Sequence, residues 1–323
     1  MTSPQLNRQP LIEKCFQRGQ YLTPSLPGYR EKLDGLLQWL LDADQVNNDQ
    51  TTQMLQLHQP TSAVVVSKQA GVVAGIDEVL HLIAHYTKIS IVSHTHDGNP
   101  VKKGDIVLSL SADMAELLAY ERVILNILGR LSGIATMTQH LIGLAGVGTA
   151  RVAGTRKAPW MHLDKKAIFA GGGLTHRLNL ADGVLIKDNH LEAFRQQLGN
   201  VSIGEAITEV VQRAMASSHE CVEIEVESPE QGRAALTAFA TAIQEKAQHP
   251  TLVVMLDNFD PPGATMFINE IRGSDIYPYM LFEVSGDVTE GSIMDWSRTG
   301  ADVVSLGALT HSVKNFNLSM AMH

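Results

Sequence analysis

Cationic side chains gather between residues 154 and 190 of a chain whose formal net charge is -9. Two pairs of neighbouring cations, Arg156 with Lys157 and His176 with Arg177, precede Lys187, which follows three apolar residues. Guanidinium groups bind carboxylates and phosphates through paired hydrogen bonds, whereas a lysine supplies a point charge, a Schiff base or acid-base chemistry. The pattern predicts a pocket for an anion that carries two carboxylates, or one carboxylate and a phosphate.

A glycine run, Gly171 to Gly173, lies inside the same stretch. Glycine has no Cβ, so the backbone amides of this run are expected to approach the bound anion closely. The run alone is weak support, because many loops contain one.

Acidic and apolar residues alternate in the segment 221–227, which places Glu223, Glu225 and Glu227 on one face. In a barrel strand the apolar face packs on helices and the other face lines the lumen, so Glu225 is expected to point into the barrel mouth. A buried carboxylate needs a cation, a hydrogen-bond donor or a metal as its partner. An edge strand with a solvated acidic face would show the same alternation, and that alternative stays open.

Short β-rich runs alternate with helical spans after residue 144, which is typical of βαβ units and a parallel sheet. The expected strands are 150–153, 184–186, 222–226, 252–256, 282–284 and 303–306, and helices are expected at 204–216 and 228–246. Polar residues or glycines follow these strands, where barrel active sites are built, so a barrel is favoured over an open sheet. The loops at Ser285-Gly286 and Gly307 are expected to bind a phosphate through backbone N–H groups.

The first 110 residues predict a mixed α/β lobe. Helices are expected at 29–43 and 77–85, strands at 63–66 and 71–74, and a turn-strand pattern at 98–107. The following helical segment, 111–144, is expected to break near Ser132-Gly133.

The composition limits the class of protein. A chain of 323 residues with 44% hydrophobic content predicts two domains, or one barrel with an extra lobe. Its acidic balance argues against nucleic acid as a partner, and neither a secretory signal nor a membrane span of ~20 apolar residues is recognisable. Cys15 and Cys221 are too few and too far apart for a disulfide framework, which fits a reducing compartment, so a soluble cytoplasmic protein is expected.

Several motifs follow one another in order over residues 121–319. They are Glu121-Arg122, Leu131-Ser132-Gly133-Ile134-Ala135, Arg156-Lys157, Gly171-Gly172-Gly173, His176-Arg177, Ile186-Lys187-Asp188-Asn189-His190, Glu223-Ile224-Glu225-Val226-Glu227, Leu256-Asp257-Asn258, Glu283-Val284-Ser285-Gly286 and Gly307-Ala308-Leu309-Thr310-His311-Ser312. Together they resemble the quinolinate phosphoribosyltransferases, the decarboxylating nicotinate-nucleotide pyrophosphorylases. The N-terminal third is only loosely similar to that family.

The resemblance implies an α/β fold with an N-terminal α/β sandwich-like lobe and an incomplete, TIM-like α/β barrel. The lobe would comprise residues 1–128, joined by the C-terminal tail at 312–323, and the barrel residues 129–311. A homodimer or a dimer-based oligomer is implied. The implied reaction, a step of NAD biosynthesis, joins quinolinate to phosphoribosyl pyrophosphate and yields nicotinate mononucleotide, pyrophosphate and carbon dioxide. It uses Mg²⁺ with phosphoribosyl pyrophosphate and no organic cofactor, and it involves neither nucleic acid nor a membrane.

By position in the motifs, four residues look like a cationic wall for the quinolinate carboxylates, namely Arg156, Lys157, His176 and Arg177. Arg122 would reach this site from the other subunit. These roles are implied by the resemblance.

The phosphoribosyl site is implied in the same way. Lys187, Glu225 and Asp257 would line it, with the two carboxylates holding ribose hydroxyls and, directly or only through substrate or water, Mg²⁺. The 5′-phosphate would bind Ser285, Gly286, Gly307 and His311. The residues expected to be catalytic are Lys157, Lys187, Glu225 and Asp257.

Three departures from the family pattern accompany the resemblance. Residues 158–163 lack two hydroxyls and an arginine that usually border the base site, and Thr175 replaces an asparagine. Asp287 stands where a second glycine is usual, so it points away from the phosphate, binds a cation, or marks an altered site.

Three other functions remain open from the sequence. They are transfer to another aromatic carboxylate, binding of a phosphoribosyl ligand without catalysis, and a Schiff-base lyase that uses Lys187. The lyase is disfavoured, because Asp188 beside Lys187 works against the desolvation that such a lysine needs.

Overall fold

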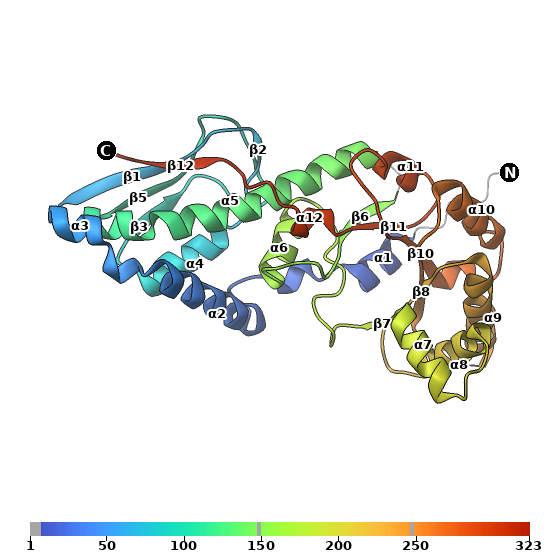
Figure 1. The fold of residues 1–323 in the computed structure, drawn as a ribbon. Helices are drawn as coiled ribbons and strands as arrows, with labels where there is room; N and C mark the ends of the chain where they lie inside the picture. Colours follow the sequence, from blue (N-terminus) through green and yellow to red (C-terminus); the bar gives the residue numbers. More distant parts are fainter. Residues whose placement is uncertain (1–7, 147–149, 246–248) are drawn as a thin grey trace. The chain divides into compact units, whose positions relative to one another are not determined.

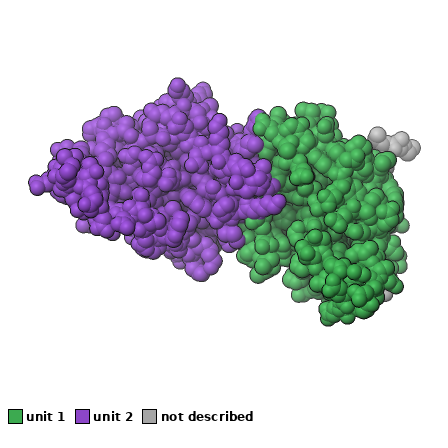
Figure 2. All heavy atoms as spheres, in the orientation of Figure 1, with its two compact units in different colours: residues 1–17, 141–156, 174–306 green, residues 18–140, 157–173, 307–323 purple. Residues whose placement is uncertain are grey.

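The computed structural model describes residues 8–146, 150–245 and 249–323, which form two compact units (Figure 2). Unit 1 comprises residues 1–17, 141–156 and 174–306, and unit 2 comprises residues 18–140, 157–173 and 307–323. Because the units differ in architecture, each is described separately.

Unit 1 is built on a six-stranded parallel sheet (Figure 1). Its strand order is β6 (Arg151–Gly154), β11 (Val303–Leu306), β10 (Met280–Val284), β9 (Thr251–Leu256), β8 (Cys221–Val226) and β7 (Val184–Ile186). The helices between or after the strands are α7 (Asp188–Gln197), α8 (Ile203–Met215), α9 (Pro229–Glu245), α10 (Pro261–Ile271) and α11 (Ile293–Ser297). All six expected strands are present, and the sheet is an incomplete barrel, which confirms the predicted α/β class.

One face of this sheet carries the acidic residues of β8. The strand register places Glu225 beside Met255 and Met255 beside Glu283, and side chains alternate along each strand, so these residues share a face. Glu223 and Glu225 are buried, and β8 lies between β7 and β9. The alternation of acidic and apolar residues in the segment 221–227 therefore marks an inner strand, as predicted. A solvated edge strand, the alternative, is excluded.

A short helix, α1 (Gln9–Phe16), fills part of that acidic face. Its Ile12 and Phe16 pack in one cluster with Val253, Leu281 and Val303. The spacing of Ile12 and Phe16 after a proline at the helix start is a signal for this helix that the sequence reading missed.

Cys15 of α1 and Cys221 of β8 form a disulfide, with their Cα atoms 5.6 Å apart. The expectation that the two cysteines are too few and too far apart in sequence for a disulfide framework was wrong, and with this bond present the cysteines no longer indicate a reducing compartment. Their separation of 206 residues is irrelevant, because α1 packs beside the start of β8 in the fold.

Unit 2 contains a four-stranded antiparallel sheet and a two-stranded sheet. The larger sheet has the order β12 (Leu318–Met322), β1 (Pro60–Ser67), β5 (Ile106–Asp113) and β3 (Ser90–Ser93), and the smaller pairs β2 (Gly71–Val72) with β4 (Pro100–Val101). The accompanying helices are α2 (Pro27–Asp44), α3 (Gln50–Leu55), α4 (Ile76–Tyr86), α6 (His162–Ala170) and α12 (Ala308–His311). The helices expected at 29–43 and 77–85 are confirmed.

The long helix α5 (Met114–Ala145) is continuous, so the expected break near Ser132-Gly133 was wrong. The Ser132 hydroxyl pairs with the backbone of Ala74, and a Cβ at Gly133 would collide with the carbonyl oxygen of Lys314. These two small residues therefore serve close packing around the helix.

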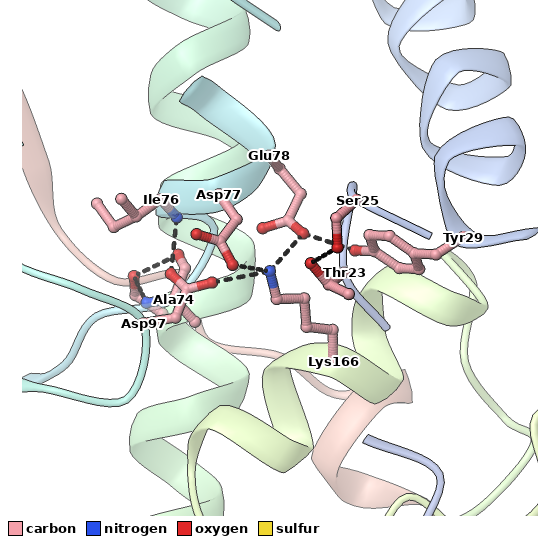
Figure 3. A network of polar contacts seen from close by, with 10 residues as sticks. Thr23, Ser25, Tyr29, Ala74, Ile76, Asp77, Glu78, Asp97 and Lys166 are labelled. Carbon is pink, nitrogen blue, oxygen red and sulfur yellow. Dashed lines mark hydrogen bonds and ion pairs between the residues drawn. The ribbon is translucent and has the colours of Figure 1, made fainter. Parts of the chain in front are cut away.

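An ion cluster around the buried Lys166 anchors α6 in unit 2 (Figure 3). The Lys166 ammonium lies 2.7 Å from Asp77, 2.9 Å from Glu78 and 3.1 Å from Asp97, and the Tyr29 hydroxyl donates to Glu78 at 2.7 Å. Burial opposes the charge of Lys166, but the surrounding carboxylates outweigh it and raise the pKa of Lys166. The cluster fixes α6 and, with it, the segment that follows Lys157.

Among the residues that the structure describes, no helix is both long and apolar enough to cross a bilayer. The expected domain division at residues 128 and 129 stays a prediction, because each compact unit combines several separate chain segments.

Candidate active site

Polar side chains meet at the carboxyl edge of the unit 1 sheet. Lys187 directly follows β7, Glu225 lies near the end of β8, and Asp257 and Ser285 directly follow β9 and β10. The Lys187 ammonium contacts the Glu225 carboxylate at 2.5 Å. Because these strands are parallel neighbours, the sheet brings the expected phosphoribosyl-site residues of unit 1 to one edge.

The charges at this edge leave an excess of carboxylate. The Glu225 side chain is 7% exposed, the Lys187 side chain is 45% exposed, and one ammonium faces the carboxylates of both Glu225 and Asp257. Burial raises the pKa of Asp257, and the negative charge of Glu225 raises it further. Two oxygen-donor carboxylates with one cation suit ribose hydroxyls or a divalent ion such as Mg²⁺.

The turn after β10 lies against Asp257. Gly286 has a φ of 89°, and a Cβ at this position would lie 2.6 Å from Oδ1 of Asp257. The Ser285 hydroxyl accepts a hydrogen bond from Ser305 at 3.0 Å. Asp287 is exposed and has a left-handed φ of 45°, so the aspartate occupies a backbone conformation that glycine adopts more easily.

Two guanidinium groups lie close together in unit 1. Arg177 is buried, and burial followed by the neighbouring charge of Arg156 lowers the pKa of Arg177, against the opposing effects of Glu223 and Asp182. Neither Arg156 nor Arg177 forms an ion pair within 4 Å in the described part of the chain. Two adjacent guanidinium groups that lack an ion pair among the described residues favour binding of an anion, which would relieve their repulsion.

His176 points into the interior of unit 1 toward two glutamates. Its Nε2 lies 3.4 Å from Glu223 and 3.3 Å from Glu283, and all three side chains are buried. Its backbone N–H donates to the carbonyl of Phe16 at 2.8 Å, so α1 helps to hold it. The expected contact of His176 with substrate stays a prediction, and its Nε2 is already engaged by carboxylates.

The protonation of this cluster follows from its hydrogen bonds. The backbone N–H of Arg177 donates to Nδ1 of His176 at 2.7 Å, so Nδ1 carries no proton and Nε2–H faces the carboxylates. Burial, with Glu283, raises the pKa of Glu223 to about 7. The same carboxylates outweigh burial and raise the pKa of His176 to about 9. Protonation at Nδ1 would break the bond from Arg177, so we assign the extra proton to the carboxyl groups.

The same hydrogen bond argues against a metal at this cluster. His176, Glu223 and Glu283 offer ligand atoms within 4.8 Å of one another. A metal on Nε2 would leave a proton on Nδ1, where the donor of Arg177 already points. Glu283 was not expected to have a role, although its position within the otherwise apolar strand β10 predicts a buried carboxyl group with a polar partner.

Unit 2 holds the other expected site residues, which are Arg122, Lys157, Gly307 and His311. A Cβ at Gly307 would lie 3.0 Å from both Cδ of Lys157 and the ring of His311, so Lys157 and His311 converge on this glycine. Arg122 lies on α5 with its side chain 61% exposed, and its nearest carboxylate, that of Glu121, is 3.9 Å away.

The triple glycine has a different role from the expected one. Its three backbone N–H groups donate to carbonyls of α6, and a Cβ at Gly171 or Gly173 would collide with α5 or α6. The run ends α6 and permits close packing within unit 2. The expectation that its amides approach a ligand was therefore wrong.

Comparison with known proteins agrees with the residue pattern. Residues 49–132 match the N-terminal domain of quinolinate phosphoribosyl transferase, and residues 134–321 match its C-terminal domain. A probable carboxylating nicotinate-nucleotide pyrophosphorylase of Bacillus subtilis strain 168 is 34% identical over 295 residues, which is 90% of this chain and 93% of the relative. The carboxylating nicotinate-nucleotide pyrophosphorylase of Mycobacterium leprae is 34% identical over 79% of this chain and 84% of its own length.

Solved structures show the same likeness. The crystal structure of NadC from Streptococcus pyogenes has a TM-score of 0.75 and 30% identity, covering 94% of this chain and 98% of that one. The nicotinate-nucleotide pyrophosphorylase of Francisella tularensis has a TM-score of 0.76 and 28% identity, covering 91% and 96%. With both domain models matched and the relatives covered almost end to end, the chain belongs to the quinolinate phosphoribosyltransferase family.

Proposed function

We propose that the chain transfers the phosphoribosyl group of phosphoribosyl pyrophosphate to quinolinate with decarboxylation, as a step of NAD biosynthesis. The products are nicotinate mononucleotide, pyrophosphate and carbon dioxide. The observation that carries the proposal is that unit 1 contains both the group of Lys187, Glu225 and Asp257 and the neighbouring Arg156 and Arg177. Within the described residues, these two arginines form no ion pair. Family membership supports the same reaction.

The chemistry follows from these charges. The bond from the ribose carbon to pyrophosphate breaks, its electron pair leaves with pyrophosphate, and the positive charge on the ribose is stabilised by the nearby Glu225 and Asp257. The ring nitrogen of quinolinate forms the new bond. Loss of carbon dioxide then leaves an electron pair on the adjacent carbon, beside the cationic nitrogen, and that carbon takes up a proton. Bound Mg²⁺ supplies positive charge for the leaving pyrophosphate, and Glu225 and Asp257 are the residues that would hold it, directly or through substrate or water.

Assembly and location belong to the same proposal. We infer a homodimer or a dimer-based oligomer, in which Arg122 completes the site of the other subunit, and a cytoplasmic protein. Family resemblance supports the dimer, and the acidic composition supports a soluble protein.

The decisive test is an assay with quinolinate, phosphoribosyl pyrophosphate and Mg²⁺, in which nicotinate mononucleotide is quantified by chromatography. Wild type should form the product, and Lys187→Ala should lose ~100-fold or more in kcat, because Lys187 balances the carboxylates beside the reacting carbon. The exposed pair of Arg233 and Glu270 offers a control, and Arg233→Ala should retain full activity. A folded wild-type protein that forms no product would refute the proposal.

A second candidate keeps the phosphoribosyl chemistry but changes the acceptor. It is favoured by the segment 158–163, which lacks two hydroxyls and an arginine that usually border the base site in the family. Thermal-shift screening of aromatic carboxylates distinguishes the two. Preference for quinolinate over every other acceptor rejects this candidate.

A further inference from the structure

A partly buried arginine on α5, Arg130, has no part in the site described so far. The Arg130 side chain is 16% exposed and forms a two-bond ion pair with Asp164, with Nε and Nη2 each 2.8 Å from a carboxylate oxygen. Asp164 is fully buried at the start of α6. Paired geometry of this kind fixes both side chains, because two parallel hydrogen bonds allow little rotation.

The same guanidinium reaches the helix that carries His311. Nη2 of Arg130 also donates to the carbonyl of Thr310 at 3.1 Å. The hydroxyl of Thr310, which is fully buried, donates to the carbonyl of Lys157 at 2.6 Å. A chain of hydrogen bonds within unit 2 thus runs from Asp164 through Arg130 and Thr310 to the backbone of Lys157.

The end of this chain coincides with two expected site residues. Lys157 and His311 both pack on Gly307, where a Cβ would lie 3.0 Å from either side chain. Holding the Lys157 carbonyl and the α12 backbone therefore sets the points from which both side chains extend.

The segment after Lys157 is held by the same carboxylate. The backbone N–H of Trp160 donates to Asp164 at 3.0 Å, and the Trp160 ring lies 5.2 Å from the Arg130 guanidinium carbon. The next residue, Met161, has a φ of 46° and a ψ of -111°, a conformation rare for a residue with a side chain. Such strain persists only where surrounding contacts impose it, and it concentrates at functional sites.

We propose that Arg130, Asp164 and Thr310 are positioning residues that hold Lys157 and His311 for phosphoribosyl transfer. The proposal rests on the proposed function and deepens it. None of the three needs to touch substrate, since they act through the backbone of Lys157 and of α12.

A double-mutant cycle between Thr310 and Lys157 tests the positioning. Thr310→Val removes the hydroxyl and keeps the shape, so kcat/KM for quinolinate should fall ~10- to 100-fold, while Thr310→Ser should restore most of it. In a Lys157→Ala background the same Thr310→Val change should cost less than about threefold, because the residue that it positions is gone. Arg130→Met should reproduce the loss.

Thr138 supplies the matched control. It is a fully buried threonine on α5 whose hydroxyl donates to the carbonyl of Ile134 at 2.8 Å, away from Lys157. Thr138→Val should leave kcat/KM unchanged, while it changes the melting temperature about as much as Thr310→Val does. Three outcomes would each overturn the proposal. Thr310→Val could keep the wild-type kcat/KM, it could lose as much kcat/KM in the Lys157→Ala background as in wild type, or Thr138→Val could lose as much as Thr310→Val.

Binding measurements separate this proposal from the proposed function. The same cycle is run on the dissociation constant of quinolinate by calorimetry, which needs no turnover. A wild-type protein that binds quinolinate without product refutes the proposed function, while a non-additive cycle in binding still supports the positioning. A wild-type protein that binds neither quinolinate nor phosphoribosyl pyrophosphate overturns both.

Discussion

At the scale of residues, the charged side chains on one face of the unit 1 sheet form two groups, one at the carboxyl edge and one in the interior. At the carboxyl edge, Glu225 is neutralised by Lys187, which remains partly exposed. Deeper in the unit, Glu223 and Glu283 face His176 without a lysine or arginine ion pair among the described residues. Lys187 and Glu225 at the edge can therefore bind a ligand in place of each other, whereas the cluster of Glu223, Glu283 and His176 keeps its extra proton inside the unit.

The interior cluster predicts that stability falls as pH rises. The pKa of Glu223 is about 7 in the folded chain against 4.5 as its ordinary value, and the extra proton of the cluster is assigned to its carboxyl groups because Arg177 donates to Nδ1 of His176. Between pH 4.5 and 7 the folded state therefore binds more protons than the unfolded state, so deprotonation favours unfolding. For Glu283, burial is outweighed by His176 and the pKa is lowered, so its contribution changes only below pH 4.5.

Denaturant unfolding at several pH values between about 5 and 9 measures how the free energy of unfolding changes with pH. Glu223→Gln should flatten it between about pH 5 and 7. Glu209→Gln, which removes an exposed glutamate paired with Arg213, should leave the slope unchanged. Equal slopes in wild type and Glu223→Gln would contradict the assignment.

Asp287 predicts a charge effect on the phosphoribosyl ligand. It follows the Ser285-Gly286 turn in a left-handed conformation and is exposed, so water screens its charge. Asp287→Asn keeps a residue that tolerates this backbone and removes the charge, so affinity for phosphoribosyl pyrophosphate should rise about fivefold at low salt. Asp287→Gly should show the same gain together with relief of strain.

Calorimetry with phosphoribosyl pyrophosphate and Mg²⁺ gives the dissociation constants, and the gain should shrink at high salt. If Asp287 instead binds a cation for the ligand, Asp287→Asn weakens binding. A loss of affinity for phosphoribosyl pyrophosphate, in place of the expected gain, would identify Asp287 as part of the metal site.

At the scale of elements, the strands were predictable and the contacts between distant segments were not. Except for β8, in which glutamates alternate with apolar residues, each strand of unit 1 is a short, mostly apolar run followed by a polar residue or a glycine. This local pattern marks both the strands and the edge that carries Lys187 and Asp257. The Ser132-Gly133 pair and the triple glycine were misread, because small residues mark a break, a ligand loop or a close packing contact equally well. Only the fold shows which neighbour approaches them.

The disulfide between α1 and β8 predicts a loss of stability on reduction. Replacing Cys15 by serine, or reducing the protein, should lower the free energy of unfolding by about 2–5 kcal/mol, because the bond restricts a long loop in the unfolded chain. Reductant should have no further effect on a protein in which both cysteines are replaced. Thiol titration of the unfolded, unreduced protein should find no free thiol among its two cysteines, and two free thiols would refute the bond.

At the scale of the whole molecule, the expected catalytic residues are divided between two units. Lys187, Glu225 and Asp257 belong to unit 1, and Lys157 belongs to unit 2. The chain passes from one unit to the other between Arg156 and Lys157, inside a single expected site motif. Sequence order could predict the motif, but which residues share a compact unit depends on contacts between segments far apart in the chain.

Assembly supplies the last prediction, because the family resemblance implies that Arg122 serves the site of a second subunit. Arg122 is largely exposed on α5, and its one ion pair with a residue that the structure describes is a 3.9 Å contact with Glu121, as expected of a side chain that reaches another chain. Arg122→Ala and Lys187→Ala should each be inactive alone. Refolded together at equal concentrations they should recover about a quarter of wild-type activity, because in a twofold-symmetric dimer half the molecules are mixed and each mixed dimer has one intact site. Sedimentation of wild type should show a dimer. If the mixture is as inactive as its components, Arg122 acts within its own subunit, since both sites of a mixed dimer would then carry one defect.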